Sequence, residues 1–303
     1  MGFGTLGPLA RFASDVGFTA VSFALWRAIS SVIALLAFLA VGVAVQRVPV
    51  TRLSAISRTD WIQLAVMGGF VAGTTISLFF AFERTTIATA LIVCYTFPAW
   101  VAMAAVALFG VHLGGRKLAA IALSGLGLVM LLAAPAGGES GVDPIGVGLA
   151  LAASLCQTGF ALVGAGGFRS VPSLQSAALL RTFSAALYGF LLVPLLIVLG
   201  HGSTITDPLG SVEAWVLILT AGIIGAAIPA VLIIAGYRRT GPTRGAVLML
   251  VEPVTGVVLA AMLLSEQPTP VQLVGGLLVL VGAALVQLTP VSRPGATTQA
   301  PVE

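Results

Sequence analysis

The segment Ala246–Glu266, AVLMLVEPVTGVVLAAMLLSE, decides how the rest of the chain is interpreted. It is long enough to cross a bilayer, yet it carries the carboxylate of Glu252 directly before Pro253 in an otherwise apolar run. An intramembrane charge costs roughly 2.5 kcal/mol or more, so it normally has a partner or marks a functional site. Proline also removes the N–H that would bond to the carbonyl of Met249, which leaves that carbonyl free to face a cavity.

The composition excludes a soluble globular protein. Hydrophobic residues make up 58% of the 303 residues and charged residues only 8%, whereas a soluble domain has about 25% charged residues. The mean hydropathy is +1.12, and we therefore predict an all-α polytopic membrane protein. The isoelectric point near 9.7 arises from basic residues in short loops and does not indicate nucleic-acid binding. Cys94 and Cys156 lie inside apolar segments, so we expect buried packing residues and no metal site.

Apolar segments of spanning length follow one another along the chain. The expected spans are Phe18–Val45, Trp61–Ala81, Ile87–Phe109, Leu118–Ala134, Ile145–Gly166, Leu174–Leu199, Val212–Gly236, Ala246–Leu264 and Val271–Leu288. The apolar stretch before Arg11 is too short to span, so either the first helix is a stub or the true start lies upstream. Counting that short helix gives ten helices, and an even number places both termini on one side.

The charged residues sort by loop. One set of alternate loops, with the tail, is basic: Arg47, Arg52, Arg58, Arg116, Lys117, Arg169, Arg238, Arg239, Arg244 and Arg293. The other set of loops is acidic, and Arg84 is the only clear basic residue in it. Its acidic residues are Asp15, Glu83, Glu139, Asp143, Asp207, Glu213 and Glu266. Because basic loops remain in the cytoplasm, we predict that both termini are cytoplasmic in a multi-pass protein of the cell membrane.

The two halves of the chain repeat one another at an offset of 154 to 155 residues. The matching pairs are Arg27 with Arg181, Phe82–Thr85 with Tyr237–Thr240, Pro98 with Pro253, and Gly127 with Gly282. Since five helices separate the copies, the copies enter the membrane from opposite sides. This pattern predicts an inverted-topology repeat, the architecture of many secondary transporters that bind substrate near the midplane.

These motifs in this order resemble the drug/metabolite transporter superfamily, in particular the EamA-type permeases. The resemblance is carried by the paired arginines, the aromatic and basic residues before Thr85 and Thr240, the two prolines, and the closing segment SEQPTPVQLVGGLLVLVGAAL at 265–285. It implies a first EamA-type repeat at 1–135, a second at 145–289 and a disordered cytoplasmic tail at 290–303. The chain departs from the family in its short first helix and at Val111, which stands where the second half has Glu266.

The resemblance implies a secondary transporter that exports a small metabolite, such as an amino acid or a related compound, by alternating access. The expected partners are a small-molecule substrate, the lipid bilayer and a proton or cation gradient, with no cofactor. Efflux of lipophilic cationic drugs is the alternative for the same fold, because one intramembrane carboxylate can neutralise such a cation. A membrane enzyme or sensor is disfavoured, since the two histidines lie in loops on opposite sides and no P-loop, Gly-x-Ser-x-Gly or signalling domain is present.

Glu252 has three interpretations: it carries a coupling proton or cation, contacts a cationic or zwitterionic solute, or serves as the buried partner of an arginine or of hydroxyl groups. Arg27 and Arg181 could support a neighbouring helix or receive a substrate carboxylate, and their duplication favours the structural role. Other candidates for a midplane site are Thr74, Thr75, Ser77, Tyr95, Thr96, Trp100, Gln157 and Thr255. Each of them could instead bond to a neighbouring helix.

The oligomeric state stays open, with a homodimer as one possibility. Small residues line one face of the expected fifth and tenth helices, at Gly125 and Gly127 and at Gly275 and Gly276. Such faces allow close helix packing, either against a second chain or within one monomer.

Overall fold

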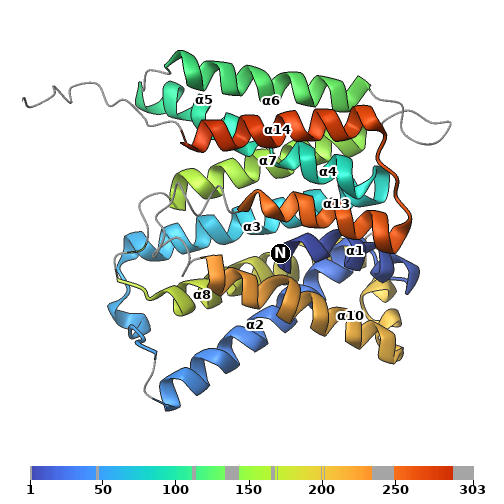
Figure 1. Cartoon of the computed structure of the whole chain (residues 1–303). Coiled ribbons are helices and arrows are strands. Elements are labelled where there is room, and N and C mark those ends of the chain that lie inside the picture. Colours follow the sequence, from blue (N-terminus) through green and yellow to red (C-terminus); the bar gives the residue numbers. More distant parts are fainter. Residues whose placement is uncertain are drawn as a thin grey trace, which may run out of the picture.

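The protein is represented by a computed structural model that describes residues 2–45, 48–110, 114–133, 143–164, 168, 170–198, 200, 202–233 and 249–288. Every regular element in these ranges is helical (Figure 1). The α-helices are α1 (Leu6–Asp15), α2 (Ala20–Ala44), α3 (Arg58–Arg84), α4 (Ile87–Cys94), α5 (Phe97–Phe109), α6 (Gly115–Ala133), α7 (Pro144–Gly164), α8 (Ser173–Leu187), α9 (Val193–Val198), α10 (Val212–Gly222), α13 (Val251–Leu264) and α14 (Pro270–Leu288). Short turns of 3₁₀ or π-helix flank them, at η1 (Gly2–Thr5), η2 (Leu53–Ala55), η3 (Tyr188–Leu192), η4 (Gly202–Ile205), η5 (Asp207–Gly210) and η6 (Ile223–Ala227).

Seven helical stretches of the described chain are long and apolar enough to cross a membrane. They are Ala20–Ala44, Arg58–Arg84, Ile87–Leu108, Pro144–Gly164, Ser173–Val198, Val212–Ile233 and Pro270–Leu288. The all-α class is therefore as predicted, whereas the count of ten spans stays a prediction. The first helix is short as expected. Helix α13 has 14 residues, Val251–Leu264, and the expected start of this span at Ala246 lies outside the described residues.

Hydroxyl side chains determine where several helices begin. In four helices the residue before the first turn accepts a hydrogen bond from the backbone N–H three residues later. These capping residues are Thr19, Ser57, Thr86 and Ser211. A cap of this kind satisfies one of the unpaired N–H groups at a helix start and contributes about 1 kcal/mol.

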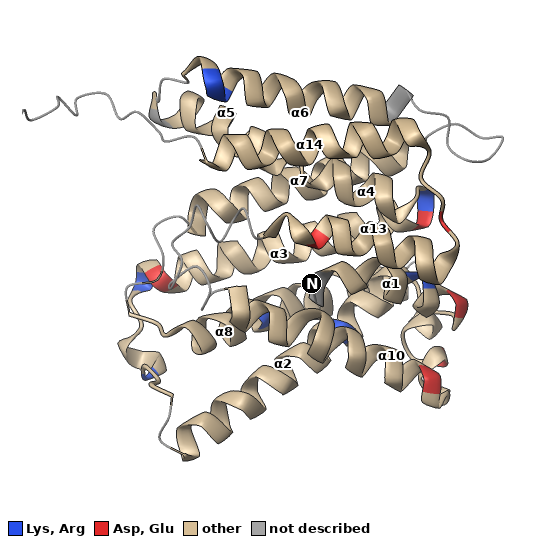
Figure 2. Cartoon of the chain, viewed as in Figure 1, with Lys and Arg blue, Asp and Glu red and all other residues tan. Residues whose placement is uncertain are grey.

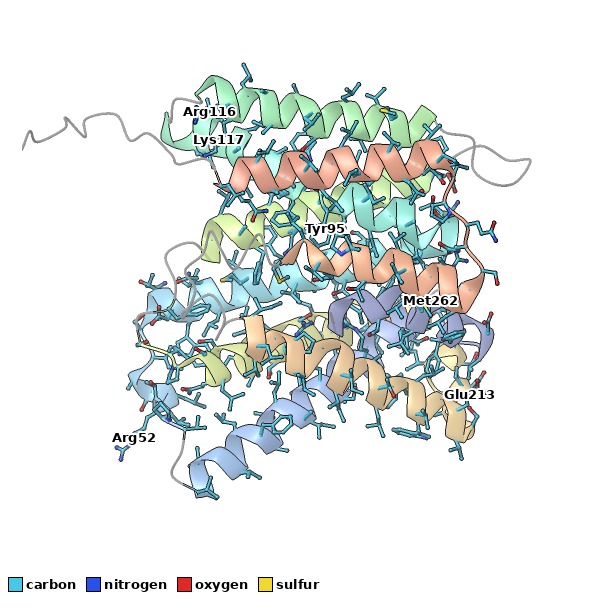
Figure 3. The ribbon with its side chains drawn as sticks, viewed as in Figure 1. Arg52, Tyr95, Arg116, Lys117, Glu213 and Met262 are labelled. Carbon is cyan, nitrogen blue, oxygen red and sulfur yellow. The ribbon has the colours of Figure 1, made fainter. Side chains whose placement is uncertain are left out.

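The helices lie side by side in layers, and the charged residues gather at their two ends (Figure 2). Figure 3 places Arg52, Arg116 and Lys117 at one end, Glu213 at the other, and Tyr95 about midway between them. We call these the basic end and the acidic end. Three described residues depart from that sorting. Arg11 and Arg84 lie at the acidic end, where they contact Glu266 and Asp143, and Asp60 accepts a hydrogen bond from Ser170 at the basic end.

The outer surface of the helices is apolar. Phe190, Val198 and Met262 are exposed by 86%, 82% and 74%. Soluble monomers rarely expose contiguous apolar surface of this extent, whereas lipid tails cover it without cost. The described helices therefore present a surface suited to a bilayer.

Helices α6 and α14 lie side by side and approach closely through their small residues (Figure 1). A β-carbon built on Gly127 would lie 2.5 Å from the carbonyl oxygen of Gly275, and one built on Gly282 would lie 2.6 Å from that of Ala120. Neither position has room for a side chain unless the backbone of the facing helix moves. At Gly127 and Gly275 the small-residue faces thus pack within the monomer.

Some residues used in the sequence analysis lie outside the described part of the chain. They are Arg47, Val111, His112, Glu139, Arg169, His201, Tyr237–Thr240, Arg244, Ala246 and the tail at 290–303, which includes Arg293.

We predict that Gly127→Ala destabilises the protein by about 1–3 kcal/mol, because the added methyl group meets backbone atoms of α14. The matched control is Gly125→Ala on the same helix, where no described atom lies within 4 Å of the new carbon. This control should be neutral or more stable, since alanine favours a helix over glycine by up to about 1 kcal/mol. Thermal unfolding of the purified variants in detergent checks both, and equal unfolding temperatures would contradict the packing.

Candidate functional site

Two proline residues stand at interruptions of helices in the middle of the bundle. Pro98 follows the break between α4 and α5, because it lacks the N–H that would bond to the carbonyl of Cys94. Pro253 lies in the first turn of α13, where proline is tolerated. Tyr95 is at the first break and Glu252 lies at the start of the second helix. The two prolines thus place one phenol and one carboxylate at helix ends inside the apolar region.

A cavity of about 170 Å³ lies among these helices. This volume is enough for several water molecules or one small solute. Its lining includes seven of the residues proposed from sequence: Arg27, Thr74, Thr75, Tyr95, Gln157, Arg181 and Glu252. The rest of the lining is largely apolar, with aromatic rings from Phe79, Phe97 and Phe160. Polar groups contributed by six different helical segments therefore converge on one mostly apolar chamber.

Glu252 and Tyr95 form the acidic side of this cavity. The side chain of Tyr95 makes a hydrogen bond with the carboxylate of Glu252. Tyr95 itself is buried, and its ring meets that of Phe97 edge-on at 5.8 Å between centroids. Glu252 keeps partial exposure because it faces the cavity. The phenol thus holds the carboxylate in place while leaving part of it accessible.

Arg27 forms the basic side together with α3. It is only 2% exposed, and its Nη2 donates a hydrogen bond of 3.2 Å to Oγ1 of Thr75. Its guanidinium carbon lies 5.4 Å from the centre of the Phe79 ring, at which distance a cation–π contact is favourable. Arg181 is also buried and lines the same cavity. The two arginines that match in the sequence are therefore brought to one site.

Four of the residues proposed from sequence are absent from the described lining of the cavity: Ser77, Thr96, Trp100 and Thr255. The indole of Trp100 donates to Oγ1 of Thr96, which also lies 3.1 Å from Oγ of Ser154 on α7. Thr255 donates to the carbonyl of Val251 one turn earlier. Trp100 and Thr255 thus bond to nearby protein groups, and Ser77 is half-buried on α3.

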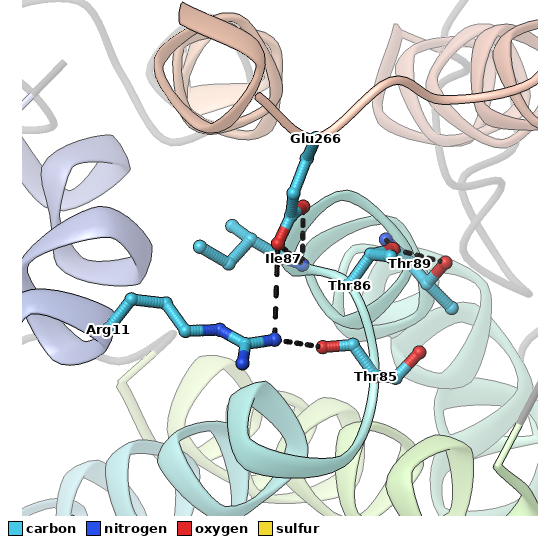
Figure 4. Close-up of polar contacts among 6 residues, drawn as sticks. All are labelled: Arg11, Thr85, Thr86, Ile87, Thr89 and Glu266. Atoms are coloured by element: carbon cyan, nitrogen blue, oxygen red, sulfur yellow. Dashed lines mark hydrogen bonds and ion pairs between the residues drawn. The ribbon is translucent and has the colours of Figure 1, made fainter. Parts of the chain in front are cut away.

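A polar cluster closes the acidic end above α4 (Figure 4). Both carboxylate oxygens of Glu266 accept from the backbone N–H of Ile87, the shorter distance being 3.0 Å. The guanidinium of Arg11 lies 3.9 Å from the same carboxylate and donates to the carbonyl of Thr85 at 3.0 Å. Ser265 has a left-handed backbone with φ of 55°, which turns the chain so that Glu266 reaches the start of α4. We call Arg11, Thr85, Ile87 and Glu266 the acidic-end latch.

The pKa of Glu266 is raised from its ordinary value. Burial is the main cause, and the Arg11 guanidinium and the backbone N–H of Ile87 offset it in part. The carboxylate caps the N-terminus of α4, where the helix dipole favours a negative charge.

Sequence reasoning did not single out Tyr188 or Arg11. Tyr188 is 1% exposed and donates to the carbonyl of Ala72 at 3.1 Å. A hydroxyl group inside an apolar span was the available signal for Tyr188, since such groups need a partner. Arg11 carried no comparable signal, because its partners are separated from it by at least 74 residues.

Within the described residues no group of three or more His, Cys, Asp or Glu side chains could hold a metal ion. The arrangement that is present offers one carboxylate, two guanidinium groups and several hydroxyls to a solute. It is suited to bind a small charged or zwitterionic molecule in a low-dielectric chamber.

A sequence model described as the EamA-like transporter family matches residues 1–133 and 144–288. None of the curated proteins compared with the chain matches it. A crystal structure of another protein has the same fold, with a TM-score of 0.57 at 24% sequence identity, over 94% of this chain and 92% of the other. The match over both halves confirms the predicted resemblance. The chain, an integral membrane protein, belongs to the EamA-like transporter family.

Proposed function

We propose that this protein is a secondary transporter that exports a small metabolite, such as an amino acid or a related compound, through the central cavity. The observation that carries the proposal is the largely buried carboxylate of Glu252, which lines a mostly apolar cavity near the start of a helix in the middle of the bundle. A charge in that position is costly unless it serves binding or coupling. Helix ends at a midplane cavity are a common feature of secondary transporters.

The contact between α6 and α14 supports an arrangement of two inverted halves. Gly127 faces the backbone of Gly275, and Gly282 faces the backbone of Ala120. Adding 155 to the number of Gly127 gives Gly282, and subtracting 155 from that of Gly275 gives Ala120. The second contact is therefore the counterpart of the first. Reciprocal contacts of this kind are expected when a pseudo-twofold axis relates the halves. We therefore retain the proposal of ten helices in two inverted repeats.

Among the described residues that line the cavity, the single acid has no acidic counterpart in the first half of the chain. The same offset of 155 residues relates Glu252 to Phe97, and both residues line the cavity. The second half thus supplies a carboxylate where the first half supplies an aromatic ring. We propose that Glu252 contacts the amine of the substrate or carries a coupling proton.

The acidic-end latch is proposed as the gate on one side of the cavity. It connects the loop after α13 with the start of α4 and with α1, so separation of α4 from α13 at that end must break its contacts. The corresponding loop of the first half has Val111 instead of an acid. If basic loops are cytoplasmic, as the charge distribution predicts, the latch faces outside and both termini face the cytoplasm.

Efflux of lipophilic cations is the second candidate function. It is favoured by the largely apolar cavity lining around one carboxylate. A cation with apolar groups would bury those groups and be neutralised by Glu252. The two candidates differ in whether the substrate also carries an anionic group.

We predict that overproduction of the wild-type protein raises the concentration of a few amino-acid-like solutes in the medium. Glu252→Gln should lower this increase by at least about tenfold, because the loss of a buried charge contact costs about 1.4 kcal/mol or more. Untargeted metabolite profiling of medium and cells provides the measurement. The control is Glu213→Gln, which removes an exposed acid at the acidic end. Full export by Glu252→Gln would remove Glu252 from the mechanism, and an unchanged medium with raised tolerance to toxic cations would favour the second candidate.

We further predict that Glu266 makes the stability of the protein depend on pH. Because burial raises the pKa of Glu266, the folded state ionises this carboxyl less readily than the unfolded state does. Its contribution is therefore complete below the ordinary carboxyl pKa and is lost as the pH rises through the raised pKa. The unfolding temperature of the wild type, measured in detergent, should fall relative to that of Glu266→Gln as the pH rises from the ordinary glutamate pKa of about 4.3. A difference that stays constant with pH would contradict this.

A further inference from the structure

Arg27 retains hydrogen-bonding capacity that the described protein does not use. A guanidinium group has five N–H donors. Within the described residues, Nη2 of Arg27 donates to Thr75, while Nε and Nη1 are buried and have no acceptor. A buried cation with unused donors is costly, so such a group normally has an anionic partner.

The described protein does not supply that anion. The salt bridges among the described residues join Arg11 to Glu266 and Arg84 to Asp143. Both lie at the acidic end and neither includes Arg27. The carboxylate that shares the cavity, Glu252, makes its hydrogen bond with Tyr95 and forms no salt bridge with Arg27. The negative and positive groups of the cavity lining are therefore not paired with each other.

A second buried group without a described partner belongs to the same cavity lining as Arg27. Oγ1 of Thr74 is buried and makes no hydrogen bond with the described residues. Thr74 is adjacent to Thr75, the residue that holds Arg27, and both line the cavity. A hydroxyl group and a guanidinium that are both unsatisfied in one cavity lining can donate to the oxygen atoms of an anion.

The two sequence-related arginines differ in this respect. Arg181 already interacts with another group of the protein, whereas Arg27 keeps Nε and Nη1 without an acceptor among the described residues. A solute that is asymmetric needs one anion site rather than two. Arg181 is therefore the arginine that supports the fold, and Arg27 is the one with donors available to a ligand.

We propose that Arg27 and Thr74 form a carboxylate-binding subsite, so that the substrate carries a carboxylate for Arg27 as well as an amine for Glu252. This inference rests on the proposed transport function and narrows its substrate to amine-and-acid solutes. Arg27 is then the residue that excludes cations lacking a carboxylate. Such a cation would leave the guanidinium unpaired and would add a like charge to the cavity.

The test measures binding to the full-length purified protein in detergent, in a buffer free of carboxylate ions. The first probe is a mixture of the proteinogenic amino acids without aspartate and glutamate. The second probe is the same mixture as carboxamides, which keep the amine and lack the α-carboxylate. We expect the acids to raise the unfolding temperature of the wild type and the carboxamides to have at least about tenfold weaker apparent affinity, as for the loss of one charge-assisted hydrogen bond.

Arg27→Gln should bind the acids at least about tenfold more weakly than the wild type, and Arg27→Lys should be intermediate because it keeps the charge without the planar group. The control is Arg52→Gln, which removes an exposed charge at the basic end and should bind as the wild type does. Thr74→Val covers the case in which the Arg27 variants do not fold. It should raise the unfolding temperature of the free protein, because it removes an unsatisfied hydroxyl, and yet reduce stabilisation by the acids.

The subsite is overturned if the acids do not stabilise the wild type, if acids and carboxamides bind equally, or if the folded Arg27 and Thr74 variants bind the acids as the wild type does. Uptake of the same acids into inverted membrane vesicles is measured separately. Binding that depends on Arg27 without any uptake would support the subsite and contradict the transport function. Uptake that is equal in wild type and Arg27→Gln would support transport and contradict the subsite.

Discussion

The structure depends on one constraint: a charged group inside an apolar helix bundle needs a partner, because neither lipid nor aliphatic side chains can solvate it. Glu252 and Arg27 meet this requirement in different ways. Tyr95 makes a hydrogen bond with the carboxylate, whereas Thr75 and the ring of Phe79 hold the guanidinium. Both groups line the cavity, and Arg27 keeps two buried donor atoms without a described acceptor. The position of the cavity therefore follows from the placement of the few ionisable groups.

Proline residues make this arrangement possible. A continuous helix would satisfy its own backbone and would run past the cavity with its side chains directed by the helical period. Pro98 and Pro253 stand next to interruptions, which bring Tyr95 and Glu252 to helix ends. The cost of an interrupted helix in an apolar region is tolerated where the freed groups line a cavity.

The two ends of the bundle are closed by different sets of contacts. At the acidic end, Glu266 caps α4 and meets Arg11. At the basic end, Asp60 accepts a hydrogen bond from the backbone N–H of Ser170, and Gln175 exchanges two hydrogen bonds with the backbone of Thr51. These contacts join loops that are far apart in sequence, while the helix middles are joined mainly by apolar packing. In the proposed transport cycle the polar ends separate in turn, because polar contacts can be exchanged for water.

The amino-acid sequence was enough to predict the helical class, the family and most of the helix bounds, such as Val271–Leu288 for the helix that spans Pro270–Leu288. These features depend on local signals, namely the length of apolar runs and the charges that end them. A polar residue in an apolar run is also a local signal, and it was enough to list Glu252, Tyr95 and Arg27 as candidates.

The packing of the helices in three dimensions determines which candidates meet. It brought Gln157 to the cavity and gave Trp100 a hydroxyl partner elsewhere, because the rotation of each helix depends on packing against helices distant in sequence. It also gave different bonding partners to Arg27 and Arg181, which occupy equivalent positions in the sequence. Hydrogen-bond partners are properties of a three-dimensional neighbourhood, so equivalent sequence positions can differ in the donors that they leave unused.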